Sequence, residues 1–455
     1  MKLRNALPWV LVLALLSVAG LGHGRSKEVE RAIDEGRHAF DAGGTLAALR
    51  LYLTNDGDQR RYYSYTNAAL GRPYQAHFVR SIEAWRGDFA TGQFSDPDSR
   101  PWVTPPAPLL PYRDFLVEYP PGFFVWALPI ALVPVSADTW GRLFALLMAL
   151  LLTLALPVGL SLAPALGLPA NREQLWRWAA GGALALGVVC THRYDAVVAL
   201  LLCVMCWGVL TARPGLGGLA AGLAFATKLT PLLPAGILGL FLLRQRRLRE
   251  LGWFTGSALA SSAAILLPAL WLAGPHLGDL LAYHADRPAQ IESTGGALLI
   301  AARLLPQLRF EEGLRMVQTF GSFNLQGPGV GALSGASSLA TVLGLLYVCV
   351  RLLRGLAGAG EQESRRLAAV AVLQSLVAFM VLGKVFSPQY LVWILPLGLV
   401  VSGASLRARG LLLSALLLTQ VIYPICYGPL SELQPWAGLL VLLRNGLLLA
   451  WAILL

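Results

Sequence analysis

Long apolar runs, separated by short polar turns, recur along almost the whole chain. Several runs reach the roughly 20 residues that a helix needs to cross the hydrocarbon core of a bilayer. The pattern therefore predicts an all-α fold, a polytopic bundle of about twelve transmembrane helices. The predicted spans are residues 1–23, 141–163, 176–190, 194–211, 216–228, 231–243, 251–272, 330–350, 367–383, 389–405, 409–426 and 436–455.

Two apolar segments need separate treatment. Residues 1–23 begin with a basic stretch and end in small residues, so they fit either a cleaved signal peptide or a retained first span. A retained span is favoured, because a polytopic protein needs an opening helix to set its orientation. The run 119–134 is short and contains Pro129 and Pro134. We expect an interfacial or re-entrant helix there, since another crossing would place basic ends on both sides of the membrane.

Basic clusters orient the predicted spans. RQRRLRE at 244–250, RLLRG at 351–355, ESRR at 363–366 and RAR at 407–409 belong in the cytoplasm by the positive-inside rule. This topology predicts a multi-pass protein of the cell membrane with both termini in the cytoplasm. Of the 25 acidic residues, the predicted cytoplasmic turns hold only Glu173, Glu250, Glu361 and Glu363. The polar chemistry is therefore expected on the extracytoplasmic side.

Two large loops are predicted on that outer side, residues 24–140 and 273–329. The first begins with a stretch of mixed charged and apolar positions, which favours amphipathic helices lying at the membrane interface. The apolar runs recur to the last residue and leave little room for a soluble unit. Residues 1–455 are therefore expected to form a single membrane-embedded domain.

Composition agrees with a membrane protein. Hydrophobic residues make up 56% of the chain and charged residues only 13%, whereas a soluble domain carries about 25% charged residues. The formal net charge of +11 follows from the cytoplasmic basic turns and favours anionic lipid headgroups as partners, not nucleic acid. All five cysteines fall in or at the end of apolar runs, which is typical of packing thiols and not of redox or metal sites.

The stretch TNDGDQRRYYSYTNAALGRPY, residues 54–74, concentrates polar groups between apolar segments. Asp56 and Asp58 stand where the chain passes from one element to the next. Each could cap a helix, or act as a general base at the mouth of a membrane cavity. Tyr62 and Tyr63 would offer flat apolar faces with a polar tip, which suit sugar rings or the headgroup zone.

Cationic side chains gather at the outer ends of several predicted helices. Singly, each is typical of a snorkelling or solvated charge, but together they could converge on one anion such as a phosphate. These residues are His192, Arg193, Lys228, His284, Arg287 and Lys384. Arg444 is the one plainly intramembrane charge, and it fits either a cavity wall or structural pairing.

Other chemistries lack their motifs. The sequence has no GxxxxGK[ST] phosphate loop, no HExxH zinc motif and no GxSxG nucleophile elbow. No metal site and no cofactor are therefore predicted, although acidic residues from separate loops could still gather a divalent cation.

Several motifs resemble those of integral-membrane GT-C glycosyltransferases, in particular the polyprenyl-phosphate-mannose-dependent α-mannosyltransferase group. The first is the opening formed by Asp58, Tyr62, Tyr63, Gly71, Pro73 and Tyr74. The others are EYPPGFF (118–124), RYDAVVALLL (193–202), ATKLTPLLP (226–234), DRPAQIES (286–293) and GKVFSPQYLVWILPL (383–397). The resemblance runs in order through most of the chain, and SPQYLVWILPL and the first-loop Asp are its more specific parts.

The resemblance implies an inverting transfer of a sugar, mannose in that group, from a polyprenyl-phosphate donor to a hydroxyl of a glycolipid or glycan acceptor outside the cytoplasm. By position, Asp58 would be the general base, with Asp56 as its rival. The donor phosphate would be held by Lys228, Arg287, Lys384 and His192. The sugar and acceptor would be lined by Asp56, Tyr62, Tyr63, Glu118, Tyr119, Glu292 and Gln389.

A transporter or lipid flippase is the competing hypothesis, because it would also need many spans and a charged cavity. Such proteins often contain paired repeats around a site at the membrane midplane. This sequence shows no internal repeat, and its ionisable groups crowd one predicted face. Transfer is therefore favoured over transport.

Overall fold

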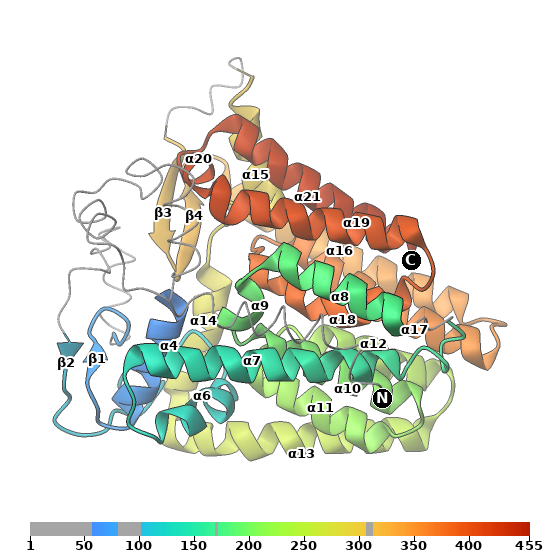
Figure 1. Cartoon of the computed structure of the whole chain (residues 1–455), viewed down its shortest axis with the longest axis horizontal. Helices are drawn as coiled ribbons and strands as arrows, with labels where there is room; N and C mark the ends of the chain where they lie inside the picture. Colours follow the sequence, from blue (N-terminus) through green and yellow to red (C-terminus); the bar gives the residue numbers. More distant parts are fainter. Residues whose placement is uncertain (1–56, 81–101, 169–171, 306–312) are drawn as a thin grey trace.

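The computed structural model describes residues 57–80, 102–168, 172–305 and 313–455. The described residues are mostly helical, and long helices lie side by side along the longest axis of the molecule (Figure 1). The elements up to the second large loop are α4 (Gly57–Ala69), β1 (Tyr74–Gln75), β2 (Trp102–Val103), α6 (Phe123–Ala131), α7 (Ala137–Leu160), α8 (Arg172–Leu186), α9 (Val189–His192), α10 (Asp195–Leu210), α11 (Pro214–Thr227), α12 (Leu232–Arg244) and α13 (Leu248–Ala273).

The second part of the chain completes the bundle. Its elements are η2 (Gly274–Gly278), α14 (Asp279–Asp286), α15 (Thr294–Ala302), β3 (Arg315–Thr319), β4 (Ser322–Gln326), α16 (Val330–Gly355), α17 (Glu361–Leu382), η4 (Pro388–Tyr390), α18 (Leu391–Val401), α19 (Leu406–Gln420), η5 (Val421–Ile425), α20 (Tyr427–Ser431) and α21 (Pro435–Leu454).

Local sequence signals set several helix starts. The side chain of Ser136 accepts a hydrogen bond from the backbone N–H of Thr139 and so caps α7. Ser293 caps α15 in the same way, by accepting from the N–H of Gly296 at 3.0 Å. Pro435 occupies the first turn of α21, where a missing N–H costs nothing.

Six described helices are long and apolar enough to cross a membrane, which supports a membrane protein. They are α7, the segment formed by α13 to α14, α16, α17, α19 with η5, and α21. Four of the other predicted spans, α10, α11, α12 and η4 with α18, form shorter apolar helices. The prediction of twelve spans is therefore supported for six, and residues 1–23 lie outside the described residues. At nine residues, α6 is too short to cross a bilayer, in line with the non-spanning helix expected at 119–134.

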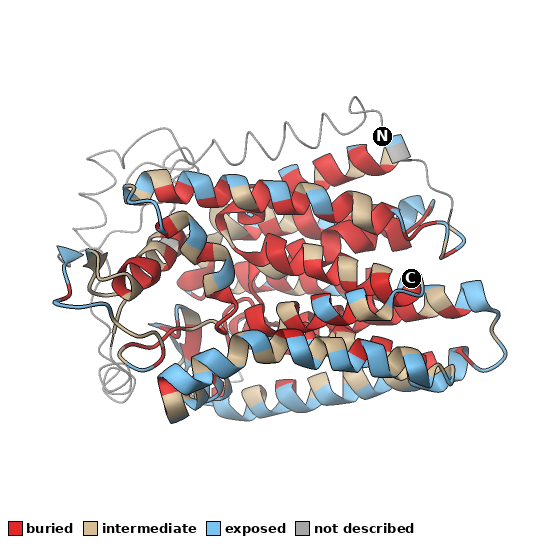
Figure 2. Cartoon of the chain, turned by 90° about the horizontal axis from the view of Figure 1, so that it is seen from below, coloured by how far each residue is buried: buried red, intermediate tan, exposed pale blue. Residues whose placement is uncertain are grey.

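The buried core follows the middle of the bundle, whereas outer helices keep exposed apolar faces (Figure 2). Trp140, Trp393 and Trp451 are almost fully buried in this core. By contrast, Trp271 near the end of α13 and Leu343 on α16 are exposed by 84% and 56%. Exposed apolar side chains of this size are typical of a surface that contacts lipid.

Two small antiparallel strand pairs correct the all-α prediction. The first pairs β1 with β2, and the second is a hairpin of β3 and β4 with Thr319 opposite Ser322. Phe320 and Gly321 form the hairpin turn, and both have positive φ angles, as a tight hairpin turn requires. The start of the first large loop, where amphipathic helices are expected, lies outside the described residues.

The ends of the bundle differ in chemistry. The basic turns from α12 to α13 and from α16 to α17 lie at one end, and α4, α14 and the two strand pairs lie at the other (Figure 1). This arrangement separates the basic clusters of the sequence from the polar motifs of the two large loops.

Candidate active site

A cavity of about 740 Å³ lies where α4, the loop after α14, the β3–β4 hairpin and residues 383–390 meet. Its wall combines segments that are far apart in the sequence, and it is rich in ionisable side chains. The Asp, Glu, Arg, Lys and His residues of this wall are Asp58, Arg60, Arg61, His77, Glu118, Arg193, Lys228, His284, Arg287, Glu292 and Lys384. The cavity therefore suits a charged, polar ligand.

Asp58 lies in the first turn of α4, where the positive end of the helix dipole favours a carboxylate. Its carboxylate forms an ion pair with Arg193, which follows α9. The Nη1 atom of Arg61 lies 3.7 Å from the other carboxylate oxygen. Two guanidinium groups therefore stabilise the charged form of Asp58 while it faces the cavity.

Arg61 also connects the first loop to the hairpin. Its Nη1 atom donates to Glu118 Oε2 at 2.8 Å, and its guanidinium lies 5.6 Å from the ring centre of Phe78. Gly321, at the tip of the hairpin, lies against this ion pair. A Cβ atom at Gly321 would stand 2.5 Å from Arg61 Nη1 and 2.8 Å from both Glu118 oxygens. The close approach of the hairpin therefore depends on glycine at this position.

Lys228, directly after α11, is held by a carboxylate and three rings. Its Nζ donates to Asp195 Oδ1 at 2.6 Å, and the same oxygen accepts from Trp393 Nε1 at 2.6 Å. The ammonium lies 4.7, 4.8 and 5.1 Å from the ring centres of Tyr194, Trp393 and Tyr390. Cation–π attraction and the ion pair together fix the position of this ammonium.

The YPPG segment, residues 119–122, packs against the end of α11, directly before Lys228. The N–H of Gly122 donates to the carbonyl of Ala226 at 2.7 Å, and Trp126 Nε1 donates to Thr227 Oγ1 at 3.1 Å. A Cβ atom at Gly122 would stand 2.5 Å from the Ala226 carbonyl oxygen. Two motifs about a hundred residues apart in the sequence are thus packed backbone to backbone.

Arg287 and Lys384 differ from Arg61, Arg193 and Lys228, each of which pairs with a carboxylate. Arg287 Nη2 donates to Ser322 Oγ at 2.6 Å, and its buried Nε makes no hydrogen bond to the described residues. Lys384 Nζ donates to the carbonyl of Ala285 at 2.6 Å. Neither forms an ion pair with a carboxylate of the described chain. Burial lowers the pKa of Lys384 and the charge of Arg287 lowers it further, whereas the Asp286 carboxylate offsets part of this shift.

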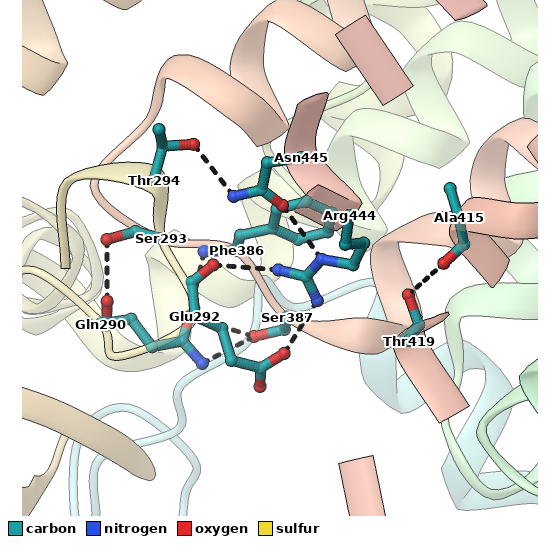
Figure 3. Close-up of polar contacts among 10 residues, drawn as sticks. All are labelled: Gln290, Glu292, Ser293, Thr294, Phe386, Ser387, Ala415, Thr419, Arg444 and Asn445. Atoms are coloured by element: carbon teal, nitrogen blue, oxygen red, sulfur yellow. Dashed lines mark hydrogen bonds and ion pairs between the residues drawn. The ribbon is translucent and has the colours of Figure 1, made fainter. Parts of the chain in front are cut away.

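Gln290 and Glu292, drawn in Figure 3, lie in the loop between α14 and α15, which begins with Arg287. Glu292 is buried and accepts a hydrogen bond from Arg444 Nη1 at 2.9 Å. Gln290 Oε1 accepts from the N–H of Phe386 at 3.0 Å and so ties this loop to the segment that carries Lys384. Tyr119 and Gln389 also line the cavity.

The sequence of the chain matches the model of a known protein family. The model of glycosyltransferase family 87 matches residues 115–382, more than half of the chain. The chain belongs to glycosyltransferase family 87. Family 87 membership confirms the resemblance to GT-C-like membrane glycosyltransferases and indicates glycosyltransferase activity, which favours transfer over transport. No curated protein matches the chain.

The family 87 match covers only part of the cavity. Lys228, Arg287 and Glu292 lie inside the matched residues, whereas Asp58 and Lys384 lie outside them. Among the residues with described positions, no group of three or more His, Cys, Asp or Glu side chains is placed to hold a metal ion.

Most residues predicted for the site of this family 87 protein meet in the cavity. Those that line it are Asp58, Glu118, Tyr119, Lys228, Arg287, Glu292, Lys384 and Gln389. Arg193 and His284, expected among the converging cations, line it as well. Asp56 lies outside the described residues.

Three predicted site residues do not line the cavity. Tyr62 is packed within an aromatic cluster, with ring centres of Phe123 and Tyr119 at 5.1 and 5.5 Å. Tyr63 donates to the carbonyl of Val135 at 3.0 Å. His192 is buried, and burial lowers its pKa to about 4. It is therefore neutral near pH 7 and unsuited to balancing a phosphate charge.

Sequence reasoning assigned no role to Arg61 or Asp195, although both belong to motifs that it singled out. Arg61 stands in the polar stretch 54–74, and Asp195 in RYDAVVALLL. A carboxylate that opens an otherwise apolar helix, as Asp195 opens α10, is the signal that points to a buried cation partner.

Proposed function

We propose that this cavity transfers a sugar, mannose by resemblance, from a polyprenyl-phosphate donor to an acceptor hydroxyl with inversion. Membership of family 87 supports sugar transfer, and the donor class is our own inference. The observation that carries it is the pair Arg287 and Lys384, two cations that bond to neutral groups and form no ion pair at contact distance with a carboxylate of the described residues. Such a pair matches a phosphate group through charge-assisted hydrogen bonds.

An apolar wall beside the cations supports a lipid-linked donor. Leu229, Leu232 and Leu233 before and within α12 line the cavity, and so do Leu345 on α16 and Phe379 on α17. A nucleotide donor would leave these side chains facing a polar group. A polyprenyl phosphate would place its chain along them and its phosphate at the cations, because each part then meets surface of its own polarity.

The proposed reaction needs a base and a stabilised leaving group on opposite faces of the sugar. Asp58 accepts the proton of the acceptor hydroxyl while that oxygen bonds to the anomeric carbon. The bond from the anomeric carbon to the phosphate oxygen breaks on the other face, and its electron pair leaves with the phosphate. Arg287 and Lys384 stabilise the charge that grows there, and Lys228, already matched by Asp195, adds ammonium hydrogens.

The remaining predicted residues take supporting roles in this proposal. Glu118, Tyr119 and Gln389 line the volume between Asp58 and the cations, where the sugar and the acceptor would lie. The basic turns at the opposite end of the bundle support an extracytoplasmic cavity and cytoplasmic termini. No metal or other cofactor is part of the proposal.

The test is transfer of labelled mannose from polyprenyl-phosphate mannose to glycolipid acceptors by the purified protein in nanodiscs. Asp58→Asn preserves size and removes the basic oxygen, so we expect turnover to fall by about a hundredfold to ten-thousandfold. Asp114→Asn is the matched control, because Asp114 pairs with Arg113 on the same loop and does not line the cavity. Its turnover should equal that of the wild type.

Two outcomes would contradict the proposal. Wild-type turnover in Asp58→Asn would make the base assignment wrong and turn attention to Asp56. No transfer from any polyprenyl-phosphate sugar, with folded protein and several acceptors, would make the donor class wrong.

Arg287→Ala should raise the donor KM, whereas Arg303→Ala should not, because Arg303 bonds to the carbonyl of Leu433 and does not line the cavity.

A further inference from the structure

The last helix holds the loop that carries the cavity residues. Arg444 of α21 is fully buried, and its Nη1 and Nη2 atoms donate to Glu292 Oε2 and to the Glu292 carbonyl, both at 2.9 Å (Figure 3). Its guanidinium lies 3.9 Å from the ring centre of Phe386. Asn445 Nδ2 donates to Thr294 Oγ1 at 2.9 Å. These contacts join α21 to a loop 152 residues earlier in the chain.

Glu292 uses only one of its two carboxylate oxygens in this network. Its Oε1 atom is buried and makes no hydrogen bond of normal geometry. Burial raises the pKa of Glu292, and Arg444 and the nearby Tyr427 hydroxyl offset part of that rise. Glu292 nevertheless lines the cavity together with Tyr427. A buried acceptor without a partner is costly unless a ligand satisfies it.

The chemistry of this oxygen selects the kind of ligand group. A carboxylate repels a phosphate and accepts hydrogen bonds from hydroxyl groups. Glu292 stands five residues after Arg287 on the same loop, so a group close to the donor phosphate lies within its reach. In a donor of the proposed class, that group is the transferred sugar.

We propose that Glu292 Oε1 accepts a hydrogen bond from one hydroxyl of the donor sugar and thereby sets donor specificity, with Arg444 as the residue that positions it. This inference rests on the proposed function, because it takes a lipid-phosphate sugar as the donor. Arg444 holds the carboxylate by its other oxygen, which fixes the position of Oε1 in the cavity wall. A site built to bind a particular hydroxyl rejects analogues that lack it.

The ion pair alone does not explain why a carboxylate stands here. Arg444 already anchors the loop through the Glu292 carbonyl, and the Asn445 side chain anchors it again at Thr294. A buried ion pair adds little stability over well-packed neutral groups, because both charges lose their hydration. Accepting a hydrogen bond from a ligand would explain a carboxylate at position 292, whereas anchoring the loop does not require one.

The experiment pairs protein variants with donor analogues. The wild type and Glu292→Gln are assayed in nanodiscs with polyprenyl-phosphate mannose and with each of its monodeoxy analogues. With the full donor, we expect Glu292→Gln to lower kcat/KM by about tenfold to a hundredfold, the usual effect of losing a hydrogen bond to a charged group. With the one analogue that lacks the recognised hydroxyl, wild type and variant should have equal kcat/KM.

Two further variants separate specificity from folding. Glu292→Asp keeps the charge but withdraws the oxygen, so it should fold and should lose the same discrimination. Gln374→Leu is the structural control, because Gln374 Nε2 donates to the carbonyl of Ala452 at 2.7 Å and also secures α21, away from the cavity. It should lower the unfolding midpoint and change kcat/KM equally for all donors. Arg444→Lys should lose discrimination in parallel with Glu292→Asp.

The outcomes distinguish this inference from the proposed function. Transfer by the wild type, with equal losses on every donor in the Glu292 variants, would overturn the specificity role and leave the proposed function standing. An unchanged kcat/KM in Glu292→Gln would do the same. No transfer by the wild type from any polyprenyl-phosphate sugar would overturn the proposed function and this inference with it.

Discussion

Replacing Asp195 by asparagine tests the electrostatic basis of the candidate site. Asp195 is 1% exposed, and one of its oxygens accepts from both Lys228 and Trp393 at 2.6 Å. Asparagine keeps the size and can still accept from the indole of Trp393. Its amide loses the charge that balances Lys228, whose ammonium then stays among three aromatic rings without a counter-ion.

The expected magnitude follows from these contacts. Breaking a buried ion pair by removing one partner costs about 3–5 kcal/mol, because it leaves an uncompensated buried charge. Cation–π attraction to the three rings keeps part of the stabilisation, at about 0.5–2 kcal/mol per ring. We therefore expect Asp195→Asn to lower the free energy of unfolding by about 3 kcal/mol. Removing the stranded charge as well, in Asp195→Asn with Lys228→Met, should recover about 2 kcal/mol of that loss.

The assay is a double-mutant cycle on unfolding by a denaturing detergent in mixed micelles, followed by tryptophan fluorescence. Each single variant and the double variant are compared with the wild type. Additive effects, with a coupling below about 0.5 kcal/mol, would refute the conclusion that Asp195 and Lys228 act as a buried pair. Transfer activity should stay low in the double variant, because it still lacks the proposed phosphate ligand Lys228.

Two further predictions concern other contacts of the site. Because the pKa of Lys384 is lowered, its charge is present at low pH and is lost as pH rises, earlier than the usual lysine value of about 10.4. The kcat/KM for the donor should therefore fall on the alkaline side, and Lys384→Arg should move this decline to higher pH; identical profiles would contradict the assignment. Gly122→Ala should lower kcat/KM by about tenfold to a hundredfold, because its Cβ would displace the backbone of Ala226, two residues before Lys228. Unchanged kinetics in this variant would show that the bracing contact does not matter for transfer.

The apolar runs were sufficient to place most helices. The spans predicted at 330–350 and 436–455 begin within one residue of α16 and α21. A hydrocarbon environment demands continuous apolar side chains and internally satisfied backbone groups, and both are properties of a local stretch of chain. Helix lengths were less predictable, since α11 has only 14 residues and spans about 21 Å, short of the roughly 30 Å hydrocarbon core.

The motifs also indicated which residues share a face of the molecule. Asp58, Arg287 and Lys384 all stand at helix ends in predicted outer segments, and all three line the cavity. The neighbour relations within a helix were harder to foresee. Arg61 lines the cavity, but Tyr62, one residue later on α4, is turned about 100° away into the aromatic core.

The sequence by itself therefore determined a helical membrane protein, a set of charged motifs and the family it resembles. Only the tertiary structure decided which charges are already paired. Asp195, which pairs with Lys228, also accepts a hydrogen bond from Trp393, 198 residues later in the chain. Glu292 pairs with Arg444, 152 residues later. The strength of an ion pair or hydrogen bond depends on separations of a few ångströms between side chains of different elements, and no local periodicity encodes those separations. The packing of the bundle thus leaves Arg287 and Lys384, among the described residues, bonded to neutral groups and not to a carboxylate.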